Sequence, residues 1–181
     1  MGKGLRNSSQ KRQHVQKFCI KKGKSTLESL DRFDRRILHA LQRDARLTLT
    51  ALAETVNLSP SQCSRRVTRL EESGVIQGRD LRLVPEALGL KVTAFIFLSM
   101  DKARMASPSD AVAELLTRDE VIDCHAITGN HDFILKVMVE DLSELSRFLS
   151  TAVTSLPGIR DIATQVAMNT LKVNGPLKVL P

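Results

Sequence analysis

The tetrapeptide "SPSQ" at residues 59–62 constrains the fold of this chain more than any other stretch. The first serine is a favoured N-cap residue, and the proline takes the first helical position, where its missing N–H is not needed. The glutamine stands where it completes a capping box. The pattern predicts a helix that begins at Pro60 and runs to about Ser73, where Gly74 ends it.

Two shorter helices are predicted before it. Asp31 is a good N-cap with Asp34 at the third helical position, and this helix should end near Asp44. Thr48 can cap a second, short helix, after which Asn57-Leu58 turns the chain. Three short helices with a tight turn between the second and third are typical of a helix-turn-helix.

The third helix has two distinct faces. At 100° per residue, Cys63, Val67 and Leu70 fall on one side and should be buried. The other side carries hydroxyl, amide and guanidinium groups, which can bond base edges and phosphates in a major groove. Arg65 and Arg69 are the best candidate readers, whereas an ordinary solvated basic face is the alternative. The predicted DNA-contacting residues are Ser61, Gln62, Ser64, Arg65, Arg66, Thr68 and Arg69.

The charge is uneven along the chain, whose net charge is +7. Residues 1–27 hold eight Lys/Arg and no acid, residues 28–83 hold ten bases and eight acids (+2), and residues 84–181 hold nine bases and twelve acids (−3). This asymmetry favours a polyanion partner for the first half and a different role for the second. We expect residues 1–27 to be a disordered basic arm, which either holds DNA phosphates or is a solvated tail.

Composition narrows the function classes. The chain has no Trp or Tyr, so stacking on single-stranded bases is not expected. No apolar run approaches the roughly 20 residues that span a bilayer. Three widely spaced cysteines fit a reducing compartment rather than a disulfide framework or zinc ribbon. We therefore expect a cytoplasmic protein with no membrane partner.

The second half alternates strands and helices. After a predicted strand pair, or wing, within 75–84 and a hinge at 85–90, the apolar and capping patterns give the order β-α-β-β-α-β, which is the ferredoxin-like split unit. A sheet with helices on one face leaves the other face needing cover, so we predict a dimer. The predicted strands are 92–100, 121–128, 133–139 and 159–173, and the helices begin at Ser107-Pro108 and Asp141-Leu142-Ser143-Glu144, the latter a capping box with Leu142, Leu145, Phe148 and Leu149 as its apolar side.

The stretches that define this organisation also carry a family resemblance. The sequence resembles the Lrp/AsnC (leucine-responsive / asparagine-regulator) family of prokaryotic transcription regulators over residues 30 to about 172. The matching stretches are "LDRFDRRILHALQRDAR" at 30–46, "LAETVNLSPSQCSRRVTRLEESGVIQG" at 52–78, "ALGL" at 87–90, "CHAITGNHDFILKV" at 124–137 and "LPGI" at 156–159.

The resemblance implies an α+β protein in which a winged helix-turn-helix domain precedes a ferredoxin-like effector and oligomerisation domain. It implies double-stranded DNA and a small effector, usually an amino acid, as ligands, with dimers that often build octamers. The implied effector-binding turn is Thr128, Gly129, Asn130, His131 and Asp132. Glycine lets a backbone approach a ligand and Asp132 can pair with an α-ammonium group, while His131 favours an acidic or polar effector side chain. An ordinary hairpin turn is the alternative.

Other function classes are less well supported. Cys124 and His125 are adjacent on a predicted strand and point to opposite faces, so they cannot serve one centre; we expect Cys124 to fill the core and His125 to be partly buried. We expect no catalytic residue, no metal site and no cofactor, although metal sensing through the histidines and an architectural DNA binder without an effector stay open. The predicted organisation is a basic arm 1–27, a DNA-binding domain 28–84, a hinge 85–90, an effector domain 91–173 and a tail 174–181.

Overall fold

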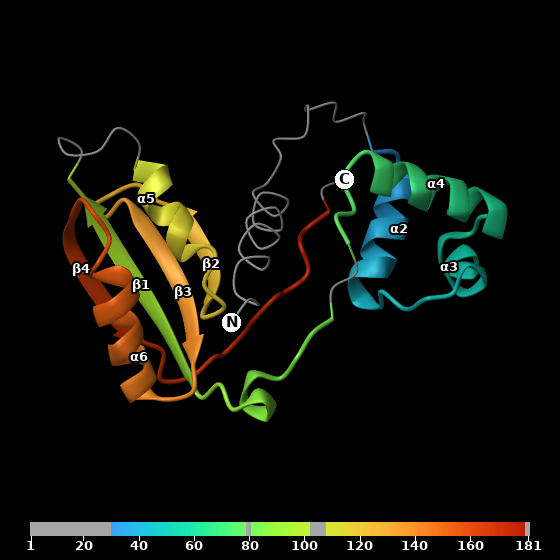
Figure 1. Ribbon diagram of the computed structural model, residues 1–181. Helices are drawn as coiled ribbons and strands as arrows, with labels where there is room; N and C mark the ends of the chain where they lie inside the picture. The colour runs from blue at the N-terminus through green and yellow to red at the C-terminus, as the bar shows by residue number, and fades with distance from the viewer. Residues whose placement is uncertain (1–29, 79–80, 102–107, 180–181) are drawn as a thin grey trace, which may run out of the picture. The chain divides into compact units, whose positions relative to one another are not determined.

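The computed structural model describes residues 30–78, 81–101 and 108–179 (Figure 1). These fall into two compact units, one made of residues 30–82 with 171–179 and the other of Leu83–Thr170. The predicted basic arm lies outside the described residues. Among the helices of the described residues, none is long and apolar enough to cross a membrane.

The first unit holds three helices with the predicted boundaries. They are α2 (Arg32–Arg43), α3 (Leu49–Val56) and α4 (Pro60–Glu72). The capping predictions are confirmed at the starts of α2 and α4, where the cap and the third helical residue exchange side-chain and backbone hydrogen bonds. Asn57, the C-cap of α3, has a φ of 57°, which makes the tight turn between α3 and α4.

One apolar core joins the three helices. Its fully buried side chains include Ile37 of α2, Leu52 and Val56 of α3, and Leu70 of α4. Burying each such side chain contributes roughly 1.5–3 kcal/mol, so packing rather than helix propensity holds these short helices together. The predicted inward face of α4 is confirmed, since Cys63, Val67 and Leu70 are all buried.

The expected strand pair of the wing is not formed. Residues 75–78 and 81–84 have no strand, and residues 79–80 lie outside the described set. Gly74, with a φ of 75°, lets the N–H of Ile76 bond back to the carbonyl of Leu70, which uses up the donor at the start of the expected ribbon. An isolated two-stranded ribbon has marginal stability in water, and here Leu81 and Leu83 are exposed, so their burial does not stabilise one.

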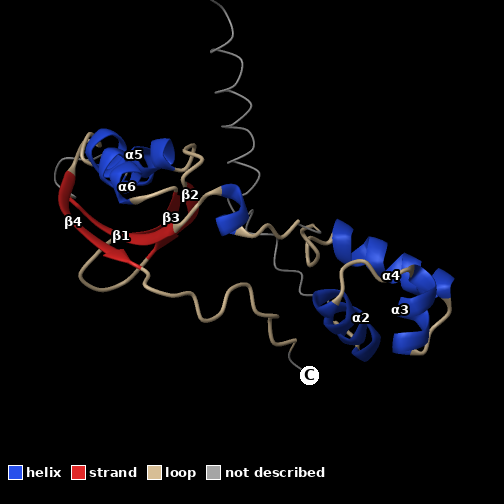
Figure 2. Ribbon diagram, turned by 90° about the horizontal axis from the view of Figure 1, so that it is seen from below, coloured by secondary structure: helices blue, strands red, loops and turns tan. Residues whose placement is uncertain are grey.

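The second unit is a four-stranded antiparallel sheet with helices on one face (Figure 2). Its spatial order is β2-β3-β1-β4, with β1 in the interior paired to β3 and β4, which confirms the ferredoxin-like prediction. A 3₁₀ turn, Pro85–Leu88, precedes the sheet, and a π-helical turn, Leu149–Val153, extends the second helix. The elements are β1 (Val92–Met100), α5 (Pro108–Leu115), β2 (Val121–Ala126), β3 (Phe133–Val139), α6 (Leu142–Phe148) and β4 (Ile159–Val166).

The sheet's helix-covered face forms the second core. Along β1, Ala94, Ile96 and Leu98 are fully buried, and Leu135 and Val137 of β3 lie beside them. A register shift in the β1–β4 ladder between Ser99 and Met100 breaks the alternation, so that three consecutive residues of β1 are buried at its end.

Three details of this unit differ from the sequence expectation. Asp141 caps α6 through the N–H of Glu144, but the carboxylate of Glu144 pairs with Arg147 instead of completing the capping box. Leu142 is exposed because it stands at the first position of the helix, outside the buried face. β4 ends at Val166 rather than Val173, and beyond the bond from the N–H of Ala167 to the carbonyl of Thr93 no further ladder to β1 is formed among the described residues. The expected cap at Ser107 lies outside the described residues.

Candidate DNA-contacting helix and effector turn

The predicted DNA-contacting residues all lie on α4, and the structure divides them into two groups. Those in the first group stand on the side opposite the buried Cys63, Val67 and Leu70. Their polar side chains therefore lie together on the outward face of α4. This group consists of Ser61, Gln62, Arg65 and Thr68, which are exposed, with Ser64 half-buried at its edge.

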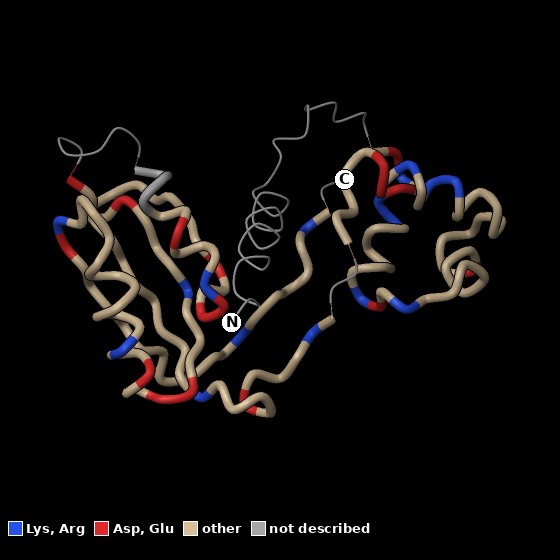
Figure 3. The backbone as a smooth tube through the Cα atoms, viewed as in Figure 1, with Lys and Arg blue, Asp and Glu red and all other residues tan. Residues whose placement is uncertain are grey.

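The second group, Arg66 and Arg69, turns toward α2. Nη1 of Arg66 lies 2.7 Å from Oδ2 of Asp31 and 2.8 Å from Oδ1 of Asp34, and Nη2 of Arg69 lies 2.5 Å from Oδ2 of Asp34. Figure 3 shows acidic and basic segments close together where α2 and α4 meet. Both arginines therefore have carboxylate partners within the unit, and Asp34 is completely buried.

Hydrogen bonds among these side chains shift the pKa values of Arg66 and Asp31. The hydrogen bond from Arg66 to Asp31, followed by that to Asp34, raises the pKa of the Arg66 guanidinium. Burial raises the pKa of Asp31, but hydrogen bonds from the Asp34 N–H, the Arg66 side chain and the Phe33 N–H together outweigh it and lower that pKa. Arg66 also lies over the ring of Phe33, 5.5 Å from its centroid.

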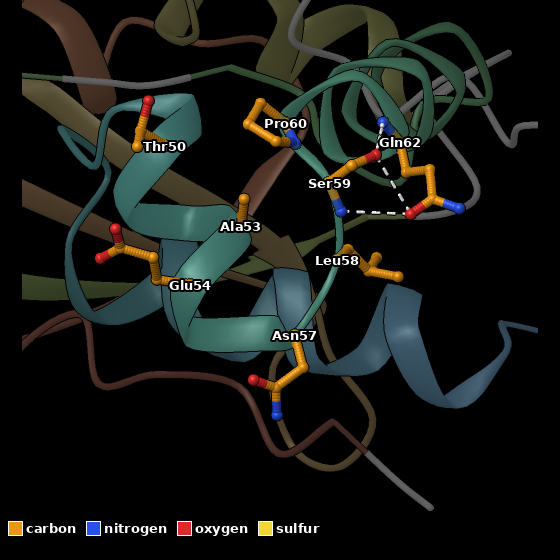
Figure 4. Close-up of a pocket in the computed structure, with 8 residues that line it drawn as sticks. All are labelled: Thr50, Ala53, Glu54, Asn57, Leu58, Ser59, Pro60 and Gln62. Carbon is orange, nitrogen blue, oxygen red and sulfur yellow. Dashed lines mark hydrogen bonds between the residues drawn. The ribbon is translucent and has the colours of Figure 1, made fainter.

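A shallow hollow lies at the start of α4, against α3 (Figure 4). The carboxylate of Glu54 lines it, which disfavours a phosphate group there. The Gln62 side-chain oxygen accepts from the N–H and the hydroxyl of Ser59, so this side chain serves the helix cap as well as the outward face. The remaining lining residues are Thr50, Ala53, Asn57, Leu58 and Pro60.

The effector turn implied by the resemblance joins β2 to β3. Thr128, Gly129 and Asn130 are exposed, and Gly129 has a φ of 115°, a backbone conformation that side chains rarely adopt. Asp132 is half-buried, and its Oδ2 accepts from the N–H of Met100 at 2.8 Å. Part of its carboxylate therefore ties the turn to the end of β1.

Two residues of β1 that the sequence analysis did not single out also hold this turn. The Ser99 hydroxyl donates to the carbonyl of Asn130 at 3.2 Å and shares a 3.1 Å hydrogen bond with Nδ1 of His131. The ring of Phe97 lies 5.4 Å from that of His131. A serine within the apolar run at the end of β1 was the available signal, because a buried hydroxyl needs a partner.

The neighbouring cysteine and histidine do not form a centre. Cys124 is half-buried against the core, as expected, but His125 is exposed rather than partly buried because β2 is an edge strand. The described residues contain no group of three or more side chains suited to a metal ion.

Comparison with known proteins agrees with this arrangement. Residues 30–77 match the family model for a winged helix-turn-helix DNA-binding domain, and residues 93–177 match that for the Lrp/AsnC ligand binding domain. The leucine-responsive regulatory protein of Salmonella typhimurium is 34% identical over 152 residues, which cover 84% of this chain and 93% of that protein. The chain belongs to the Lrp/AsnC family of transcription regulators.

Solved structures of similar proteins show the same fold as this Lrp/AsnC regulator. A transcriptional regulator of Neisseria meningitidis in complex with L-Met has a TM-score of 0.75 and 33% identity, over 83% of this chain and 97% of that one. A feast or famine regulatory protein of Mycobacterium tuberculosis complexed with L-methionine has a TM-score of 0.74 and 32% identity, over 80% and 96% of the two chains. The match to the DNA-binding model includes all of α4, and the match to the ligand-binding model includes the turn at 128–132.

Proposed function

We propose that this regulator reads double-stranded DNA with α4 and that an amino acid bound at the turn 128–132 changes its DNA binding or its assembly. One observation carries the DNA-binding part. The side of α4 opposite the core presents Ser61, Arg65 and Thr68 to solvent, with the types and spacing of groups that bond base edges and phosphates. We infer that the protein acts as a cytoplasmic regulator and not as an enzyme.

Two features of the turn support the effector proposal. Gly129 leaves open space around its backbone, since a side chain there would meet nothing within 4 Å. Asn130 is exposed, while its carbonyl and the neighbouring Asp132 are held by β1, so the turn is fixed in place without being covered. The two solved relatives carry methionine, which makes L-methionine the first effector to test on this chain.

The open face of the sheet supports a dimer. Because side chains alternate along a strand, Phe95 and Phe97 of β1 and Ile134 and Met138 of β3 point away from the helices and are half-buried. Half-buried aromatic and aliphatic side chains on one sheet face need a cover, and a second subunit provides one. His131 contacts Phe97 and so reaches this face, which would bring the effector turn to the subunit boundary.

A two-fold dimer presents one α4 per subunit. In dimeric helix-turn-helix proteins the two recognition helices enter successive major grooves about 34 Å apart and read a pseudo-palindrome. We propose this arrangement here, with octamers as a further level of assembly. We propose that the DNA contacts come from the set predicted on α4, in which Arg65 is exposed and lies outside the ion pairs that hold Arg66 and Arg69. The predicted set is Ser61, Gln62, Ser64, Arg65, Arg66, Thr68 and Arg69.

A gel-shift titration tests the proposal. The protein is titrated against genomic fragments, beginning with the region upstream of its own gene, with and without each amino acid at millimolar concentration. We expect selective shifts that respond to one amino acid, with methionine tested first. Selective shifts that ignore every amino acid would favour an architectural role, and binding no better than the salt-sensitive background would refute the DNA-reading role of α4.

A further inference from the structure

Four charged residues join the start of α2 to the middle of α4. We call them the Asp34 cluster: Asp31, Asp34, Arg66 and Arg69. Asp34 is its centre, because its two carboxylate oxygens accept from different arginines, at 2.8 and 2.5 Å. Oδ2 also accepts from the backbone N–H of Asp31 at 3.1 Å. A single buried side chain therefore completes the cap of α2 and fixes two side chains of α4.

The cluster changes the charge that α4 offers to DNA. Arg66 and Arg69 face two carboxylates, so their positive charge is balanced within the unit. Arg65 is exposed, and the part of the chain that the structure describes gives it no ion-pair partner. Of the three arginines, Arg65 is therefore the one whose positive charge is not balanced by an ion pair within the described residues.

The pairing is costly to break. Moving Arg69 to a phosphate would leave Asp34, which has no exposed surface, with fewer partners, and a buried charge without compensation is strongly destabilising. Arg66 is held more firmly still, by two carboxylates and the ring of Phe33. The side chain of Arg69 is 48% exposed, so exposure alone would not distinguish it from a DNA contact.

We infer that Asp34 is a positioning and specificity-determining residue. By pairing with Arg66 and Arg69 it keeps both side chains from contacting DNA, so that Arg65 is the arginine of α4 that contacts DNA. The inference rests on the proposed DNA-binding role of α4. Withholding two arginines limits sequence-independent attraction to phosphates, which raises the ratio of specific to non-specific binding.

The number of arginines that meet phosphate can be measured from the salt dependence of binding. For B-DNA, the slope of log K against log salt changes by about 0.9 for each phosphate that is neutralised. Binding of the full chain to a random-sequence duplex is measured by fluorescence anisotropy over a range of salt concentrations, for wild type, Arg65→Gln, Arg69→Gln and Asp34→Asn. Arg65→Gln and Arg69→Gln remove the same charge from the same helix and are matched to each other.

The expected slopes separate the roles. Arg65→Gln should make the slope shallower by about 0.9 per bound subunit, Arg69→Gln should leave it unchanged, and Asp34→Asn should make it steeper by about 0.9 for each arginine released. A merely structural Asp34 would lower affinity without steepening the slope. Asp34→Asn should also reduce the ratio of specific to random-sequence affinity.

A slope for Arg69→Gln as shallow as that for Arg65→Gln would overturn the inference, as would an Asp34→Asn slope no steeper than wild type in a protein that circular dichroism shows to be folded. If Asp34→Asn does not fold, Arg69→Gln decides alone, since it leaves the Arg66–Asp34 pair in place. Failure of wild type to bind any DNA would instead refute the proposed function itself.

Discussion

The hydroxyl of Ser99 and Nδ1 of His131 lie 3.1 Å apart, and the same hydroxyl donates to the carbonyl of Asn130. A hydroxyl has one proton, and a carbonyl can only accept, so Nδ1 of the histidine must supply the proton of the other bond. The neutral ring then carries its proton on Nδ1 and leaves Nε2 as an acceptor. This end of the turn would favour a ligand group that donates a hydrogen bond, which narrows the acidic or polar side chain expected from the sequence to a polar donor.

The protonation of His131 is open to direct measurement. At a pH of about 8.5, where ordinary imidazoles are neutral, the nitrogen-15 shifts of His131 should show the Nδ1–H form. Ser99→Ala should remove this preference and cost about 1 kcal/mol of unfolding free energy. His125, exposed on β2, is the control and should not respond. A wild-type ring protonated on Nε2 would contradict the assignment.

The start of α2 should weaken in acid. Hydrogen bonds hold the pKa of Asp31 below its unfolded value, so the folded state binds fewer protons there. The resulting stability is present above the unfolded value of 3.8 and is lost as the pH falls through the folded value. Because the Asp31 side chain is 45% exposed, we expect less than about 1 kcal/mol from this source.

Asp31→Asn isolates this charge, because asparagine caps a helix as well as aspartate does. Thermal unfolding followed from neutral pH down to about pH 2.5 should show wild type more stable at neutral pH, with a difference that shrinks as the pH falls below the unfolded value of 3.8. A difference that stays constant over the whole range would mean that the aspartate contributes by shape and not by charge.

Two serines at the start of α4, the N-cap Ser59 and the helical Ser61, should affect different properties. Ser59 accepts from the N–H of Gln62 at the helix start, so Ser59→Ala should cost about 1 kcal/mol in urea unfolding. Ser61 stands on the outward face, so Ser61→Ala should leave stability nearly unchanged and weaken binding to the operator. Equal effects of the two variants on stability, or unchanged operator affinity in Ser61→Ala, would contradict the division between cap and reader.

Local signals made most of the fold predictable. The capping residues Asp31, Thr48 and Ser59 fix where the helices begin, because each cap bonds within three residues along the chain. Strand β1 was predictable to the residue because its apolar run is bounded by charged residues. The strand after Pro157-Gly158 was predicted too long, since its end depends on where a partner strand stops.

The candidate site was predictable only in part. The helical wheel placed Arg65 on the outward face, but it gave no sign that Arg66 and Arg69 both pair with the carboxylate of Asp34. The partner of Arg69 is Asp34, 35 residues earlier, and such contacts depend on how two helices pack. The equal spacing of Asp31 with Asp34 and of Arg66 with Arg69, three residues in each pair, is the signal that indicates them.

Arg65 provides the most direct test of α4 as the recognition helix. Wild type and Arg65→Ala are titrated against the strongest genomic site and against duplexes in which each base pair of that site is replaced in turn. We predict that Arg65→Ala loses about 1–3 kcal/mol on the native site and no longer distinguishes substitutions at one G·C pair that wild type discriminates against. Unchanged affinity and the same pattern of discrimination in both proteins would contradict the assignment of α4 to the major groove.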